Sequence, residues 1–159
     1  MADWKEVVKM TPEERSALPY NDPRLDSFTS VVEERYGLPS GLLLAVKNAG
    51  ERSSTLKKSG EVNASGKGAK GVMQFIDSTR KAYQHDFMNP LASIDASGRY
   101  FKDLMERYDG DVKAAIAEYN GGTRAARAAQ RGEEIPYAET RNYLKNIKQF
   151  MMKHRGMGE

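Results

Sequence analysis

Hydrophobic residues recur at intervals of three and four along most of the chain, which is the spacing of amphipathic helices. The clearest early set is Leu25, Phe28, Val31, Val32 and Tyr36. Two later segments repeat the pattern, with apolar faces formed by Leu91, Ile94, Tyr100, Phe101, Leu104 and Tyr108 and by Tyr143, Leu144, Ile147, Phe150 and Met151. The pattern therefore predicts a mainly α-helical protein.

Local start and stop signals divide this pattern into separate helices. Thr11 with Pro12 and Glu14 matches a capping box with proline in the first turn. Asp22-Pro23, Asn89-Pro90 and Asp111 are further start signals. We predict helices over residues 23–36, 40–50, 90–109, 112–119, 123–132 and 137–153, with short helices after Pro12 and from Asp77.

The segment from Arg52 to Lys70 departs from this pattern. It is rich in Ser, Gly and Lys and has almost nothing to bury. We predict a long polar loop or a small β-hairpin here. Long loops without secondary structure are uncommon in small domains, and those that occur often have a functional role.

Length and composition fit a single globular domain. The chain has 159 residues, of which 39% are hydrophobic and 30% charged. We expect an N-terminal helical extension over residues 1–21, a main domain over 22–153 and a flexible tail over 154–159. No apolar run reaches the length of a bilayer span, so stable membrane insertion is not expected.

Charge and residue types exclude several other classes. The net charge of +3 is modest, and no aromatic residues are interleaved with Lys57, Lys58, Lys67 and Lys70, so we expect no nucleic-acid partner. There is no cysteine, and the two histidines, His85 and His154, have no spaced metal-ligating partners. We therefore expect neither a metal nor another cofactor.

Four polar motifs stand at predicted helix ends or turns. They are Glu51-Arg52-Ser53, Gly71-Val72-Met73-Gln74-Phe75, Glu118-Tyr119-Asn120-Gly121-Gly122 and Glu139-Thr140-Arg141. Each alone is compatible with an ordinary helix terminus. Their order and spacing carry more information than any one of them.

In this order the motifs resemble the catalytic domain of soluble-type lytic transglycosylases, which are relatives of goose-type lysozyme. The resemblance covers roughly residues 25 to 150. It rests on the apolar helix before Glu51, the run from Ser65 to Gln74, the Ala117-Glu118-Tyr119-Asn120-Gly121-Gly122 run and Glu139-Thr140-Arg141-Asn142-Tyr143. It implies a lysozyme-like fold in which the polar loop or hairpin lines the substrate groove.

The resemblance also implies a function and roles for individual residues. The substrate is the glycan strand of peptidoglycan, cleaved between N-acetylmuramic acid and N-acetylglucosamine with formation of 1,6-anhydro ends. Glu51 is the expected catalytic acid, and Glu139 and Ser53 are expected to support it without touching substrate. The expected substrate contacts are Ser65, Met73, Gln74, Phe75, Tyr119, Asn120 and Tyr137.

Two departures from the family pattern leave alternatives open. Arg52 stands between Glu51 and Ser53, where the family has Glu-Ser, and Ser65 follows Glu51 by 14 residues, several more than usual. Glu61, which lies inside this longer loop, is therefore a rival acid. We favour Glu51 because it follows a rigid helix, which positions a catalytic group better than a loop.

Other functions compete with the transglycosylase. A hydrolytic muramidase of the same fold would need a further acid to position water, and Asp77 and Asp86 are available. A non-catalytic murein-binding module of a virion is the alternative that is not an enzyme. Residues 1–8 lack the layout of a signal peptide. We therefore expect a bacteriophage virion protein, with other virion proteins as partners, that is delivered to the host periplasm or cell wall during genome ejection.

Overall fold

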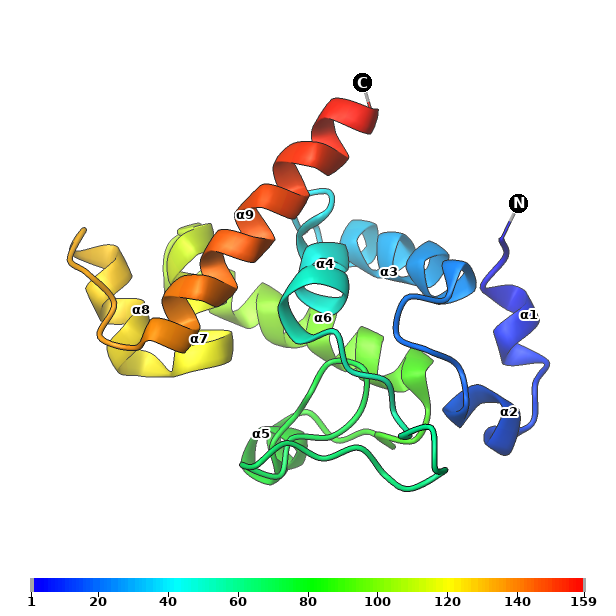
Figure 1. The fold of residues 1–159 in the computed structure, drawn as a ribbon. Coiled ribbons are helices and arrows are strands. Elements are labelled where there is room, and N and C mark those ends of the chain that lie inside the picture. The colour runs from blue at the N-terminus through cyan, green and yellow to red at the C-terminus, as the bar shows by residue number, and fades with distance from the viewer. Residues whose placement is uncertain (1, 159) are drawn as a thin grey trace.

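Helices form almost all of the regular structure in the computed structural model, which describes residues 2–158 (Figure 1). The elements are α1 (Lys5–Val8), α2 (Pro12–Ser16), α3 (Pro23–Arg35), α4 (Leu42–Ala45), the π-helical turn η1 (Val46–Glu51), α5 (Asp77–Ala82), α6 (Pro90–Arg107), α7 (Val112–Gly121), α8 (Thr123–Gln130) and α9 (Ala138–Gly158). The prediction of a mainly α-helical domain is confirmed.

Side-chain caps fix the starts of several helices where the sequence predicts them. The Thr11 hydroxyl accepts a hydrogen bond from the Glu14 N–H at 3.2 Å, and the Glu14 carboxylate accepts one from the Thr11 N–H at 2.9 Å. The side chains of Asp22, Asn89 and Asp111 each accept one backbone N–H hydrogen bond and so cap α3, α6 and α7. These caps bond N–H groups that the first helical turn leaves unpaired.

The helix before Glu51 differs from the prediction at both ends. Ser40 makes no cap; the Glu33 carboxylate instead accepts hydrogen bonds from the N–H groups of Gly41 and Leu44, each at 3.0 Å. The helix also does not stop at Gly50. From Val46 it widens into the π-helical turn η1, which includes Glu51.

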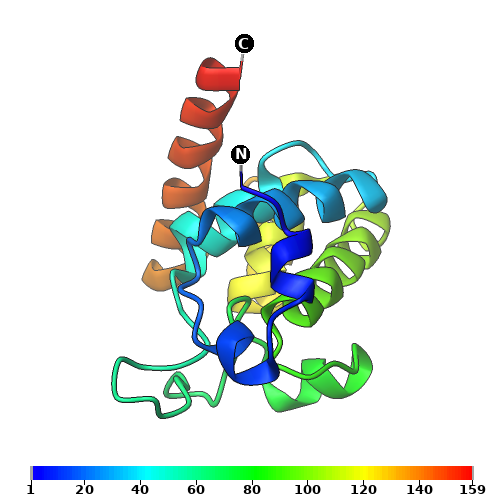
Figure 2. The ribbon, with the colours of Figure 1, turned by 90° about the vertical axis from the view of Figure 1, so that its right-hand side faces the viewer.

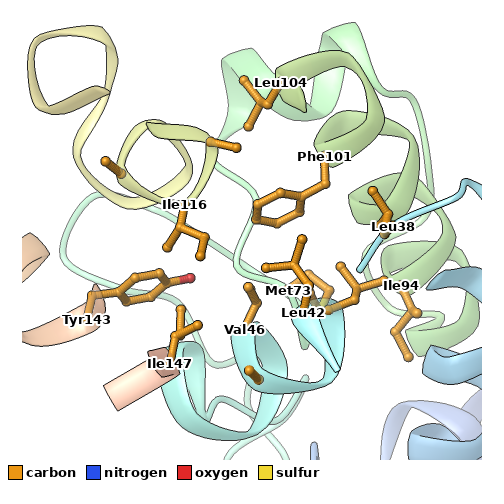
Figure 3. Packing of buried hydrophobic residues seen from close by; sticks show 14 of the residues in the cluster. Leu38, Leu42, Val46, Met73, Ile94, Phe101, Leu104, Ile116, Tyr143 and Ile147 are labelled. Atoms are coloured by element: carbon orange, nitrogen blue, oxygen red, sulfur yellow. The ribbon is translucent and has the colours of Figure 1, made fainter. Parts of the chain in front are cut away.

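The hydrophobic core holds this helix between α3 and α9 (Figure 1). Leu42 and Val46 are fully buried among side chains from α6, α7 and α9, including Phe101, Ile116 and Ile147 (Figure 3). At Gly98 of α6, an added Cβ would come within 2.4 Å of a Val32 methyl group, so α3 and α6 approach closely there. The segment that carries Glu51 is therefore anchored on several sides.

The polar loop after Glu51 forms the lower part of the molecule in Figure 1, together with α5. Within the described residues it has only isolated antiparallel bridges, which join Leu56 to Val62, Ala64 to Lys70 and Lys70 to Phe75. It is therefore a folded-back loop with short β contacts rather than a regular hairpin.

The N-terminal segment packs on the main body of the protein, beside α3 (Figure 2). Val7 is fully buried, and the Trp4 ring lies 5.2 Å from the Phe28 ring, measured between centroids. At the other end, α9 continues to Gly158 and so includes residues 154–158, for which the sequence predicts a flexible tail. No proline interrupts this stretch, and Glu159 lies outside the described residues. Among residues 2–158, no helix has the length and apolar character needed to cross a bilayer.

Candidate active site

A groove of about 370 Å³ gathers residues from all four polar motifs. Seven of the residues predicted for the site line it, namely Glu51, Ser65, Gln74, Phe75, Tyr119, Asn120 and Glu139. They come from η1, the loop, the end of α7 and the start of α9. The fold therefore brings together groups that are up to 88 positions apart in the sequence.

Glu51 stands at the end of the π-helical turn and is partly buried. The Arg52 N–H donates to the Lys47 carbonyl at 3.0 Å, which closes the turn with the five-residue spacing of a π-helix. Arg52 itself has a positive φ of 49°, and its side chain is exposed. The additional residue after Glu51 thus turns the chain out of the helix and does not line the groove.

The Glu51 carboxyl has the protonation behaviour of a general acid. Burial disfavours its charged form and raises its pKa to about 7, and the negative charge of Glu139 acts in the same direction. The Tyr143 hydroxyl opposes this effect, because it donates a hydrogen bond to Glu51 Oε2. The group therefore exchanges its proton near neutral pH, as acid–base catalysis requires.

Tyr119 forms part of the groove wall, but its hydroxyl already makes two hydrogen bonds within the protein. It donates to the Met73 carbonyl at 2.5 Å and accepts a hydrogen bond from Ser97 at 3.3 Å. Its ring stacks on Phe101, with the centroids 4.7 Å apart and an angle of 15° between the planes. The hydroxyl that contacts Glu51 therefore belongs to Tyr143 and not to Tyr119.

The Gly71–Phe75 turn contributes Gln74 and Phe75 to the groove wall next to Tyr119. Gln74 has a positive φ of 53°, and its side-chain amide donates to the Gly71 carbonyl at 2.9 Å, which leaves the amide oxygen available. Phe75 is 3% exposed and packs edge-on against Tyr119 at 6.3 Å between centroids. Ser65 lies at the rim, where its hydroxyl accepts hydrogen bonds from the N–H groups of Lys67 and Ala69.

Three predicted site residues lie outside the groove lining. Met73 is fully buried in the core and its side chain does not line the groove, whereas its backbone carbonyl accepts the hydrogen bond from the Tyr119 hydroxyl. Tyr137 is exposed but is not part of the groove wall. Ser53 donates to the backbone carbonyl of Glu51 at 3.1 Å and so braces the main chain rather than the carboxyl group.

The Glu139 motif also differs from its expected arrangement. Glu139 is exposed at the groove, whereas the family resemblance implies a residue that supports the acid without touching substrate. The buried residue is Thr140, whose hydroxyl donates to the Asn120 side-chain oxygen at 2.8 Å. A Cβ at Gly121 would come within 2.5 Å of the Thr140 hydroxyl oxygen, so this junction requires glycine. Thr140 therefore joins the start of α9 to the end of α7.

The rival acids lie elsewhere. Glu61 is exposed near the tip of the loop, where its carbonyl accepts a hydrogen bond from the Lys57 N–H at 2.8 Å. Neither Glu61, Asp77 nor Asp86 lines the groove. Glu51 is thus the one of these four carboxyl groups that the fold presents to a ligand in the groove.

Two functional neighbours, Tyr143 and Glu118, belong to the sequence motifs, but the sequence assigns neither of them a role in the site. Tyr143 belongs to the Glu139–Tyr143 motif, but its spacing indicates only an apolar helix face. Glu118 is a carboxylate within the buried face of α7, and Arg107 and the Tyr108 hydroxyl both donate to it. A charged residue directly after Ala114–Ala117 is the available signal for Glu118. Among residues 2–158, no three His, Cys, Asp or Glu side chains are grouped to hold a metal ion.

The fold and groove together define a lysozyme-like helical domain whose cleft holds an acid with a raised pKa, Glu51. Residues 30–141 match the family described as "Transglycosylase SLT domain", and the chain belongs to this family. Its fold is similar to the X-ray structure of an inactive mutant of the lytic transglycosylase Slt from Pseudomonas aeruginosa, in which a glutamate is replaced by glutamine. That similarity has a TM-score of 0.64 at 20% identity, over 79% of this chain and 23% of the other. The present chain thus spans about a quarter of that chain's length.

Proposed function

We propose that this domain is a peptidoglycan lytic transglycosylase with Glu51 as its only acid–base group. The observation that carries the proposal is the Glu51 carboxyl, which lines a sugar-sized groove with a pKa raised to about 7. Membership of the transglycosylase SLT family supports the same chemistry. The similar solved structure, which is named a lytic transglycosylase, supports it at the level of the fold.

In the first step, protonated Glu51 gives its proton to the oxygen that links N-acetylmuramic acid to N-acetylglucosamine. The bond between this oxygen and the anomeric carbon breaks, and the N-acetylglucosamine end leaves with the proton. The N-acetyl oxygen of the muramic acid bonds to the anomeric carbon and takes up the developing positive charge, as in substrate-assisted glycosidases. No second protein carboxylate is required as a nucleophile.

In the second step, the Glu51 carboxylate accepts the proton of the carbon-6 hydroxyl of the same muramic acid. That oxygen attacks the anomeric carbon and displaces the N-acetyl oxygen, which closes the 1,6-anhydro ring. Glu51 is again protonated, so the cycle balances without water. A group that acts as acid and then base works best with a pKa near the working pH, and such assistance contributes about 10²–10⁴-fold.

Of the other carboxylates in the groove, Glu118 is not free to orient water for hydrolysis. Both oxygens of Glu118 are occupied, by Tyr108 and Thr123 on one side and Arg107 on the other. Glu139 contributes a negative charge that raises the pKa of Glu51. A hydrolytic muramidase would need one of these groups to orient water, and a binding module would have no use for a buried acid.

The test is digestion of purified peptidoglycan followed by mass analysis of the released ends. An anhydro end is lighter than a hydrolysed end by one water, so product mass separates transglycosylase from muramidase. Glu51→Gln should abolish turnover with folding and murein binding intact. Glu61→Gln is the matched control and should keep most activity. The reverse ranking would place the acid in the loop, and wild-type binding without cleavage would favour the non-catalytic module.

We also propose that the domain acts from a bacteriophage virion, where it would open the host wall during genome ejection. This proposal rests on the sequence alone. Mass spectrometry of purified particles would test it, because the chain should be found in the virion itself. Detection only in lysates of infected cells would contradict it.

A further inference from the structure

A second hollow, of about 530 Å³, lies beside α8 and is separate from the catalytic groove. Its lining includes Thr123, Arg124, Arg127, Arg131, Glu133 and Glu134. It therefore combines one side of α8 with the segment that leads into α9, at the left of Figure 1.

Three arginines dominate this hollow. Arg124, Arg127 and Arg131 are spaced by three and four residues, which places them on one side of the helix. The alanines between them, Ala125, Ala126, Ala128 and Ala129, are buried against the body of the protein. The helix is thus fixed by its small apolar residues and presents its guanidinium groups to the hollow.

These guanidinium groups have no carboxylate partner within the described chain. The neighbouring arginines Arg107 and Arg141 form salt bridges with Glu118 and Glu134, whereas no salt bridge among residues 2–158 involves Arg124, Arg127 or Arg131. Glu134 lies 3.7 Å from Arg141, which leaves Glu133 as the one unpaired acid of the lining. The hollow therefore has an excess of positive charge, and the planar guanidinium forks suit carboxylate ligands.

The hollow begins where the catalytic groove ends. Thr123 lines the hollow and the preceding Gly122 lines the groove. The Thr123 hydroxyl also lies 3.3 Å from Glu118, which is itself part of the groove wall. From Arg124 to Arg131 the helix advances by about 10 Å, which equals roughly three residues of an extended peptide.

We propose that this hollow binds the carboxylate groups of the peptide stems that branch from the glycan strand. The inference rests on the proposed function, because a strand seated in the groove would lie next to Thr123, where the hollow begins. The arginines match the stem carboxylates, and Glu133 offers a partner for the amino group of the stem's diamino acid. The domain would then recognise the peptide stems of the wall as well as its sugars.

The experiment compares cleavage of two substrates, intact peptidoglycan and glycan strands whose stems have been removed by an amidase. Wild type should cleave the stem-bearing substrate with a kcat/KM about 5-fold higher, a size typical of a few partly exposed ion pairs. The Arg124→Gln, Arg127→Gln, Arg131→Gln triple variant should lose this preference through a raised KM while cleaving bare strands at the wild-type rate. Arg155→Gln, an exposed arginine on α9, is the matched control and should keep the preference.

Each alternative outcome has a separate meaning. Wild-type cleavage of both substrates at equal rates would overturn this inference and leave the proposed function intact. Cleavage of neither substrate would overturn the proposed function itself. An equal loss on both substrates in the triple variant would assign the arginines a structural role. A third arm uses bare strands that carry phosphate polymers, and recovery of the preference there would assign the hollow to phosphate and overturn the stem proposal.

Discussion

The Tyr143 hydroxyl donates a hydrogen bond to Glu51 Oε2, although 92 positions separate the two residues in the sequence. Tyr143 is buried, and its ring points from α9 into the core (Figure 3). The hydrogen bond stabilises the charged form of Glu51, whereas burial of the same carboxyl favours the neutral form. Two opposing effects therefore set the pKa of Glu51, and each can be altered by mutation.

Tyr143→Phe removes the effect that lowers the pKa of Glu51. The pKa should then rise above about 7, and the alkaline limb of the pH–rate profile should move to higher pH. Loss of the bond that orients the carboxyl should lower the maximal rate by about tenfold. Tyr137→Phe, at an exposed site outside the groove lining, should leave both unchanged. An unshifted alkaline limb in Tyr143→Phe would show that the hydroxyl does not tune the acid.

Glu139→Gln removes an effect that raises the pKa of Glu51. Because the charge of Glu139 raises the pKa of Glu51, its removal should move the alkaline limb to lower pH and reduce activity at pH 7. Glu61→Gln removes one negative charge from an exposed loop position and should not move the limb. If the two variants gave identical profiles, Glu139 would not influence the acid.

Gly50→Ala tests the packing beside the acid. A Cβ there would lie 2.8 Å from two ring carbons of Tyr143, so either the ring or the π-helical turn must move. We expect a loss of about 1–3 kcal/mol in unfolding free energy, typical of overpacking, together with a loss of activity. Gly66→Ala is the control for stability, since a Cβ there has nothing within 4 Å and the residue needs no positive φ. Urea unfolding of both variants measures the difference.

The raised pKa of Glu51 predicts a pH-dependent stability. A folded-state value of about 7 against 4.5 means that the folded protein binds more protons between these pH values than the unfolded chain. This contribution is fully present below pH 4.5 and is lost as the pH rises through about 7. The loss corresponds to about 3 kcal/mol of unfolding free energy. Glu51→Gln should lack it, so denaturant unfolding at pH 5 and pH 8 should show a smaller difference in the variant. Parallel curves for both proteins would contradict the raised pKa.

The helix boundaries could be predicted where the signals are local. The caps at Thr11, Asp22, Asn89 and Asp111 lie next to the N–H groups that they bond, so neighbouring residues suffice to identify them. The cap of α4 could not be found in this way, because its carboxylate comes from Glu33, on another helix.

The π-helical turn depends on tertiary contacts that the sequence pattern does not show. A lysine is usually found at the surface, yet Lys47 is fully buried. Its ammonium group lies 2.5 Å from the Tyr20 carbonyl oxygen and 2.6 Å from Asp26 Oδ1. Met73 and Gln74 belong to one motif, but the turn directs the first into the core and the second toward the groove. Motif membership predicts where the site is, and the local backbone decides which side chains reach it.

In a regular helix, the burial of Leu42 and Val46 would also determine the direction of the residue 51 side chain. The wide turn at Val46–Glu51 changes this relationship. Each α-helical residue turns the direction of its side chain by about 100°, so a helix seated by Leu42 and Val46 would fix the direction of residue 51 as well. The π-helical turn has more residues per turn than an α-helix, so the Glu51 side chain points in a different direction relative to the buried face. Conversion of this turn to a regular α-helix of the same length would therefore rotate the carboxyl group away from its present direction, while Leu42 and Val46 keep their places in the core.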